Sequence, residues 1–202
     1  DFDDKAKIYV LTGPNRGGKS VITCAVGQAQ ALCQLGLPVP AASAVISPVT
    51  AIYTHFPTGS EGDGAIEKGR LGEECDRLNK IFDTLDRYSL ILLDESFSST
   101  GSYEASYIAS EVLTGFSMIG CKCLFSTHLH ELSGQLDEIN KKCAAMGGVP
   151  IDTLVAGIHG SERSFEITRA KPDGKSYARD IAEKFGLSYD RIMERAKRNA
   201  QK

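Results

Sequence analysis

The sequence predicts an α/β fold: a largely parallel central sheet with flanking helices, then an antiparallel β portion and a C-terminal helical pair. Short apolar segments typical of buried strands alternate with longer segments whose apolar residues recur at helical intervals. The order strand, helix, strand, helix, strand favours right-handed crossovers between parallel strands. The 202 residues suffice for one such domain with a substantial core.

Each expected element rests on a local pattern. Gly36 is expected to cap the first helix, because glycine adopts the left-handed conformation that ends helices, and Pro38 keeps the helix from continuing. Residues 89–93 form a near-continuous apolar run, typical of a strand buried on both faces. In chain order we expect a strand at 7–12, a helix at 21–35, strands at 44–46 and 51–56, a helix at 71–85, a strand at 89–93, a helix at 103–119 and a strand at 122–127.

The pattern changes in the last third of the chain. Residues 142–149, 152–159 and 164–170 are expected to form antiparallel strands joined by Gly-rich turns. Two helical segments, 176–185 and 189–200, end the chain.

Composition and charge argue against several kinds of protein. The net charge is −3, which argues against this domain alone gripping a nucleic-acid backbone, because that requires a basic face. No apolar run approaches the ~18 residues that span a bilayer, and no secretory signal is present, so we expect a cytoplasmic protein without a membrane segment. Residue 1 is Asp rather than Met, so we expect a fragment of a longer protein. The polar, Gly-rich residues 57–64 are expected to form the most mobile loop of the domain.

A phosphate-binding motif lies between the first expected strand and the first expected helix. In such a loop, backbone N–H groups and the positive end of the helix dipole bind phosphate. Lys19 is expected to reach the β and γ phosphates, and Ser20 to hold Mg²⁺. The nucleotide-binding residues expected from the motif are Gly13, Pro14, Asn15, Arg16, Gly17, Gly18, Lys19 and Ser20.

Two acidic residues, Asp94 and Glu95, follow the expected strand at 89–93. Ligands of open α/β sheets bind at the carboxyl ends of the strands, so both side chains are expected to face the phosphates. Asp94 is expected to hold the Mg²⁺ shell, and Glu95 to position water as a general base. His128 directly follows the next strand and is expected to sense the γ-phosphate.

Together these motifs resemble the ATPase domain of the MutS family, the DNA mismatch-repair proteins and their relatives. The pair Pro14-Asn15 and the double glycine after it are more specific than a generic phosphate loop. The similarity covers nearly the whole chain. It rests on the segments 12–20, 92–95, 100–103, 126–132 and 174–178.

The resemblance implies a P-loop NTPase of the ABC-like class that uses ATP and Mg²⁺. Such domains work as head-to-tail homodimers, in which each nucleotide lies between the phosphate loop of one subunit and a signature segment of the other. ATP binding and hydrolysis drive a DNA clamp formed by domains that are absent from this chain. Asn15 would organise the γ-phosphate and water, and His128 would be the switch histidine. Residues 1–202 would be one MutS-like ATPase domain, with a nucleotide-binding core at 1–172 and C-terminal helices for dimerisation at 173–202.

The signature segment departs from the family. It usually reads Ser-Thr-Phe-Met followed closely by a glutamate, whereas the matching residues 69–74 begin Gly69-Arg70-Leu71. The serine that would contact the partner's γ-phosphate is missing. Arg70 either supplies positive charge to the partner's site, like an arginine finger, or is a surface arginine at a helix start.

Two other functions compete with an ATP-hydrolysing dimer. The altered signature favours a nucleotide-gated dimerisation module that binds ATP but scarcely hydrolyses it, whereas an intact Glu95 argues against that module. An ATPase head of another ABC-like DNA-maintenance or transport protein would usually carry a Ser-Gly-Gly-type signature, which this sequence lacks.

Overall fold

The computed structural model describes residues 2–3, 5–57, 65–159, 162–171, 183 and 185–200. The chain divides into two compact units, Asp1–Pro172 and Asp173–Lys202. Among the described residues we find no helix with the length and apolar character needed to cross a membrane. The elements of the first unit are β1 (Ile8–Thr12), α1 (Lys19–Gln34), β2 (Ile52–His55), α2 (Ala65–Phe82), β3 (Leu90–Asp94), α3 (Ser102–Ile119), β4 (Lys122–Ser126), α4 (His130–Ala145), β5 (Ile151–His159) and β6 (Glu162–Arg169).

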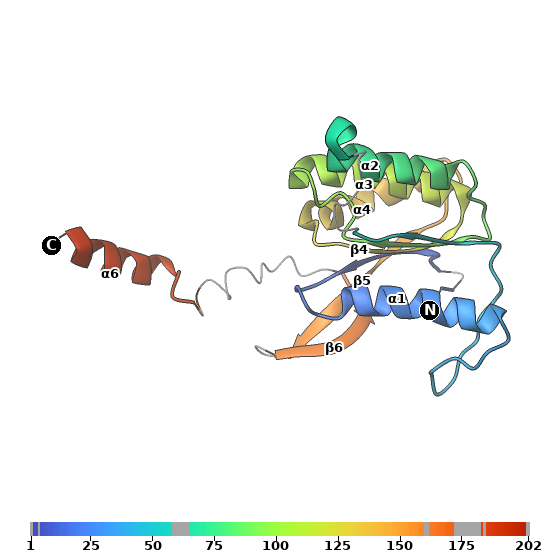
Figure 1. The fold of residues 1–202 in the computed structure, drawn as a ribbon, viewed down its shortest axis with the longest axis horizontal. Helices are drawn as coiled ribbons and strands as arrows, with labels where there is room; N and C mark the ends of the chain where they lie inside the picture. The colour runs from blue at the N-terminus through green and yellow to red at the C-terminus, as the bar shows by residue number, and fades with distance from the viewer. Residues whose placement is uncertain are drawn as a thin grey trace. The chain divides into compact units, whose positions relative to one another are not determined.

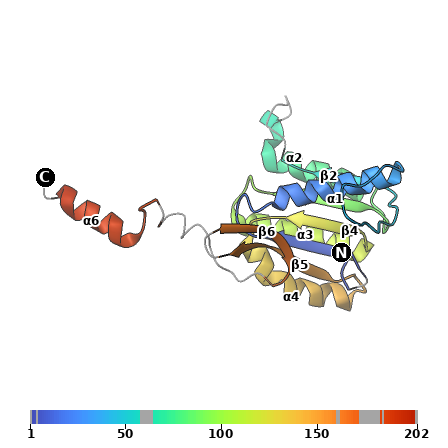
Figure 2. The ribbon, with the colours of Figure 1, turned by 90° about the horizontal axis from the view of Figure 1, so that it is seen from below.

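The six strands form one mixed sheet in the order β2-β3-β4-β1-β5-β6. Every neighbouring pair is parallel except β5 and β6, which run antiparallel and lie side by side in Figure 2. The expectation of a largely parallel sheet with an antiparallel portion is therefore confirmed. Strand β5 belongs to both parts, since it is parallel to β1 and antiparallel to β6.

Helices cover both faces of the sheet. Figure 1 shows α2, α3 and α4 on one face and α1 on the other. Alternate strand residues serve the two faces, as the pleat requires. In β3, Ile91 and Leu93 join the core beneath α2, α3 and α4, whereas Leu90 and Leu92 join the smaller core beneath α1. The central strands are thus buried on both sides, which explains their unbroken apolar sequences.

Two expected strands are absent from the described residues. Residues 142–149 instead contain the end of α4 and the turn after it. The stripe Leu132, Leu136, Ile139 and Cys143, with helical spacing, is buried against the core, and this packing overrides the local strand-like composition.

The segment at 44–46 also forms no strand among the described residues. Prolines stand on both sides of it, and Val45 is fully exposed, so no apolar face stabilises pairing. The chain is held nearby by a side chain instead: Gln34 accepts a hydrogen bond from the Val49 N–H at 3.0 Å and donates one to the Val49 carbonyl oxygen at 3.2 Å.

Helix α2 begins six residues earlier than expected and bends at Gly69, whose φ is 65°. The remaining expected elements are present with boundaries shifted by a few residues, and the second unit contains α6 (Tyr189–Ala200). The expected helix at 176–185 lies largely outside the described residues, as does most of the loop at 57–64.

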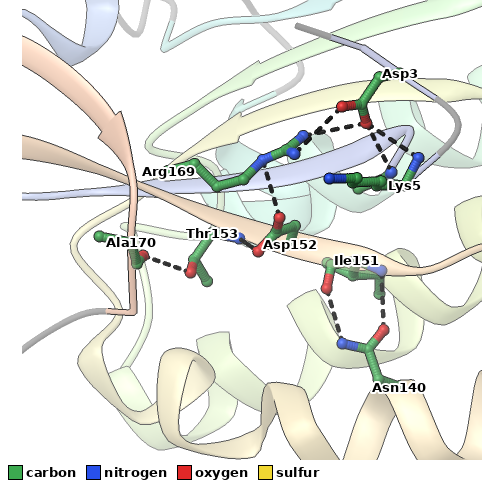
Figure 3. A network of polar contacts seen from close by, with 9 residues as sticks. Asp3, Lys5, Asn140, Ile151, Asp152, Thr153, Arg169 and Ala170 are labelled. Carbon is green, nitrogen blue, oxygen red and sulfur yellow. Dashed lines mark hydrogen bonds and ion pairs between the residues drawn. The ribbon is translucent and has the colours of Figure 1, made fainter.

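A polar network ties the start of the chain to the antiparallel edge (Figure 3). Arg169 of β6 donates to Asp3 at 3.2 Å and forms an ion pair with Asp152 of β5 at 3.1 Å. Its guanidinium also lies 5.0 Å from the ring centroid of Tyr9, against which Phe2 packs edge-on. Phe2 therefore packs against the smaller core.

Candidate functional site

The candidate site lies at the carboxyl ends of the central parallel strands. Strands β1, β3 and β4 are neighbours and end at Thr12, Asp94 and Ser126. The phosphate-binding motif leaves β1 at this edge and leads into α1. In open α/β sheets this edge is the usual place for ligands.

The backbone of the motif is a tight loop. The Gly17 N–H donates to the Pro14 carbonyl oxygen at 3.1 Å. Gly18 caps α1 with a φ of 91°, and Arg16 also has a left-handed backbone, with a φ of 61°. Gly13 has a φ of 137° and passes so close to Ala156 of β5 that an added Cβ would lie 2.8 Å from the alanine Cβ. The loop aims the N-terminus of α1 at the site, and such an end binds anions.

Lys19 is the buried cation of the site, with 4% of its surface exposed. Its ammonium group donates to the carbonyl oxygens of Gly13 at 3.1 Å and Pro14 at 3.2 Å. Burial lowers the pKa of Lys19, and the carboxylates of Glu95 and Asp94 oppose that shift. A desolvated ammonium beside carboxylates is suited to a ligand that carries both phosphate and a divalent cation.

The two acidic residues at the end of β3 have different surroundings. Asp94 is buried, and the Ser126 hydroxyl donates to its Oδ1. Glu95 is half-buried, and its N–H donates to the Ser126 carbonyl oxygen at 2.8 Å. The φ of Glu95 is 47°, so the chain leaves the extended conformation at this residue and both carboxylates lie near Lys19.

A pocket of about 670 Å³ contains part of this constellation. Its polar wall comes from the phosphate loop and the turn after β3, and its apolar wall from α1 and β6. The polar part of the pocket can therefore bind an anion such as phosphate, and the adjoining apolar part can hold the aromatic base of a nucleotide. The residues that line it are Arg16, Gly18, Lys19, Ser20, Val21, Ile22, Ala25, Glu95, Phe165 and Ile167.

The apolar wall was missed in the sequence. Phe165 has a left-handed backbone, with a φ of 57°, and its side chain is 69% exposed. Ile167, two residues later in β6, lines the same pocket. The sequence predicts antiparallel strands at 152–159 and 164–170, but a lone aromatic residue in a polar strand does not indicate that β6 lies beside α1.

Other predicted site residues lie outside the pocket lining. Asn15 and His128 are exposed, and among the described residues neither lines the pocket. Gly69, Arg70 and Leu71 lie at the bend of α2. Arg70 forms an ion pair with Glu74 of its own chain, with 3.6 Å between Nε and Oε1.

A buried histidine stands behind the turn that follows β3. His55 is 2% exposed, and its Nδ1 lies 2.7 Å from the Ser96 hydroxyl oxygen. Burial lowers the pKa of His55, and the nearby Arg77 cation lowers it further, whereas the Glu74 carboxylate acts in the opposite direction. His55 therefore favours the neutral form in the folded protein.

We expect the free energy of unfolding to fall as the pH drops below about 6.5, because the unfolded chain then binds a proton at His55 that the folded chain resists. The contribution of neutral His55 to the free energy of unfolding is complete above the pKa of histidine in the unfolded chain. It is lost as the pH falls through the lower pKa of His55 in the folded chain. Urea unfolding at pH 7.5 and 5.5 measures it. His55→Gln should show a weaker pH dependence than the parent chain, and an identical dependence would contradict the assignment.

Comparison with known proteins identifies the family of this chain. The family model for MutS domain V matches residues 9–202. The chain is 32% identical to the DNA mismatch repair protein MSH6 of Arabidopsis thaliana over 196 residues, which are 96% of this chain and 14% of that protein. It is 32% identical to the DNA mismatch repair protein MutS of Clostridium kluyveri over 179 residues, covering 83% of this chain and 20% of that protein.

A third relative is the probable DNA mismatch repair protein Msh6 of Drosophila melanogaster, which is 35% identical over 128 residues, or 63% of this chain and 11% of that protein. The chain thus spans between a tenth and a quarter of the length of these relatives. The family model covers far more than half of the chain. The chain therefore belongs to the MutS family and corresponds to its domain V.

Proposed function

We propose that this domain binds ATP with Mg²⁺ and hydrolyses the γ-phosphate at a composite site between two head-to-tail copies of the chain. The observation that carries the proposal is the pocket in which Lys19, Ser20 and Glu95 meet at the N-terminus of α1. Membership of the MutS family excludes the competing assignment to an unrelated ABC-like head, and it supports the P-loop, ABC-like class for this fold.

Each residue of the motif has a part in nucleotide binding. The backbone N–H groups of the phosphate loop, to which Pro14 contributes none, surround the phosphates, and Lys19 exchanges its contacts with the loop carbonyl oxygens for phosphate oxygens. Arg16 lines the same pocket and adds a second positive charge to its rim. The base lies against Phe165 and Ile167, because an exposed aromatic face favours stacking.

The oxygen ligands of the site suit a magnesium ion. Ser20 and Asp94 supply a hydroxyl and a carboxylate, which are the ligand types that Mg²⁺ prefers. Asp94 is already oriented by the Ser126 hydroxyl. When bound, Mg²⁺ would neutralise charge that develops on the phosphates.

Glu95 is the general base of the proposed reaction. Its carboxylate accepts the proton of the attacking water, and Lys19 stabilises the negative charge that develops in the transition state. Asn15 and His128 approach the γ-phosphate from the solvent side. The Gly69–Leu71 segment faces the nucleotide of the second copy, and residues 173–202 contribute to the dimer.

We propose that DNA is bound by domains other than this one. The relatives that match the chain carry the name DNA mismatch repair protein, and the chain spans only part of their length. We therefore propose that ATP binding and hydrolysis here drive a DNA clamp in mismatch repair or a related process.

Mg²⁺-dependent ATP hydrolysis, measured against protein concentration, tests the proposal. The specific rate should rise with concentration, because each site needs a second subunit, and it should vanish in Lys19→Ala. Tight ATP binding without turnover at any concentration would contradict the proposal. That result would favour the nucleotide-gated dimerisation module, for which the glycine and arginine in the signature segment are the supporting observation.

A further inference from the structure

The turn that carries the proposed general base has a strained backbone. Glu95 has a φ of 47° and Phe97 a φ of 65°, both in the left-handed region that side chains rarely adopt. Such a conformation is unfavourable for a residue with a side chain and persists only where its surroundings hold it. Contacts around residues 95–99 therefore determine where the Glu95 carboxylate points.

The strongest of these contacts comes from α2. Glu74 is 9% exposed, and its Oε2 accepts a hydrogen bond from the Phe97 N–H at 2.5 Å. Its Oε1 accepts a second hydrogen bond from the Ser99 hydroxyl at 3.3 Å. Hydrogen bonds to a carboxylate are about twice as strong as neutral ones, so Glu74 offsets the strain at Phe97.

Two further contacts hold the first half of the turn. The Glu95 N–H donates to the Ser126 carbonyl oxygen at 2.8 Å, which ties the start of the turn to β4. The ring of His55 contacts the Ser96 hydroxyl at 2.7 Å, which ties the next residue to β2. Glu74 holds the second half, where Phe97 is left-handed and fully buried. Without Glu74, the backbone at Phe97 would therefore relax toward an unstrained conformation, and the position of the neighbouring Glu95 would change.

Glu74 also contacts the altered signature segment. The oxygen that accepts the Ser99 hydroxyl lies 3.6 Å from Nε of Arg70, one turn earlier on α2. The helix bends at Gly69, and among the described residues no atom lies within 4 Å of a Cβ added there. Neighbouring atoms therefore do not hinder Gly69 itself, whereas Leu71 packs against the larger core. A displacement of Arg70 would act on the carboxylate that holds the turn.

We infer that Glu74 is a positioning residue for Glu95, and that its ion pair with Arg70 links the Gly69–Leu71 segment to the general base of the same subunit. The inference rests on the proposed function, in which this segment faces the nucleotide of the second copy. Nucleotide bound to one subunit then influences the placement of Glu95 in the other. Arg70 serves this link within its own chain rather than acting as an arginine finger.

Steady-state ATP hydrolysis by the 202-residue chain tests the inference with Glu74→Gln. The amide keeps the shape but loses the charge, so kcat should fall on the order of tenfold while ATP binding stays within about twofold. Glu138→Gln is the matched control, since Glu138 also forms an i,i+4 ion pair, with Lys142 at 3.3 Å, but on the exposed side of α4. It should leave both values unchanged.

A double-mutant comparison separates positioning from general destabilisation. In a Glu95→Gln background, Glu74→Gln should cause no further loss, because there is no general base left to position. An equal loss in both backgrounds would overturn the inference. If Glu74→Gln does not fold, Ser99→Ala replaces it, since Ser99 is exposed and the change removes one hydrogen bond to Glu74. Its kcat should fall about threefold, again only when Glu95 is present.

The two proposals fail in different ways. A parent chain without ATP hydrolysis would overturn the proposed function and this inference together. A parent chain that hydrolyses ATP, combined with a Glu74→Gln variant of unchanged kcat, would overturn the inference alone.

Discussion

Glu95→Gln is expected to lower the rate of ATP hydrolysis by about 10²–10⁴-fold while ATP binding is retained. Glutamine has nearly the same shape and can occupy the same left-handed backbone, but it cannot accept a proton from water. Removing the negative charge also leaves Lys19 with one fewer carboxylate nearby, which favours the anionic nucleotide. Single-turnover hydrolysis of radiolabelled ATP measures the chemical step, and equilibrium dialysis measures binding.

Lys19→Ala provides the contrast for this experiment. Lys19 is a buried cation that lines the pocket, so its removal should abolish both binding and hydrolysis. A Glu95→Gln variant that hydrolyses ATP as fast as the parent would show that another group positions the water. Loss of binding in Glu95→Gln would show instead that the substitution disturbs the loop.

The parts of the site that were predictable from the sequence are those in which local pattern and fold agree. The phosphate loop is formed by residues that are adjacent in the chain, and the sequence on either side of it predicts the strand before it and the helix after it. The acidic pair at Asp94 and Glu95 is the end of an apolar run that is buried on both faces of the sheet. The carboxyl ends of the strands of a parallel sheet meet at one edge, so the convergence of these segments can be predicted without knowing how their side chains pack.

The parts that were not predictable depend on contacts between distant segments. Antiparallel strands at 152–159 and 164–170 were expected, but Phe165 reaches the pocket from an irregular stretch of that pair, where its backbone is left-handed, and no sequence pattern indicates this irregularity. Glu74 is buried where an acidic residue is usually exposed, because the Phe97 N–H, 23 residues later, donates a hydrogen bond to it. The prediction of a strand at 142–149 was wrong for a similar reason, because the burial of α4 against the core makes the start of this segment helical.

Gly13→Ala is expected to lower the free energy of unfolding by about 2–4 kcal/mol and to weaken ATP binding at least tenfold. Two costs combine at this position. A φ of 137° is a conformation that alanine rarely adopts, and the new Cβ would lie 2.8 Å from the Cβ of Ala156 and 3.0 Å from its carbonyl oxygen. Ala156 is fully buried and its strand is paired on both sides, so the phosphate loop must move instead, and its N–H groups would no longer converge on one point.

Gly36→Ala separates the backbone cost from the steric one. Gly36 also has a positive φ, of 71°, but among the described residues no atom lies within 4 Å of an added Cβ. Its substitution should cost about 1–2 kcal/mol and leave ATP binding unchanged, because Gly36 follows the far end of α1 from the site. Urea unfolding and ATP titration of both variants measure the difference. Equal effects on ATP binding would mean that the close approach of Gly13 to β5 does not hold the phosphate loop in its binding geometry.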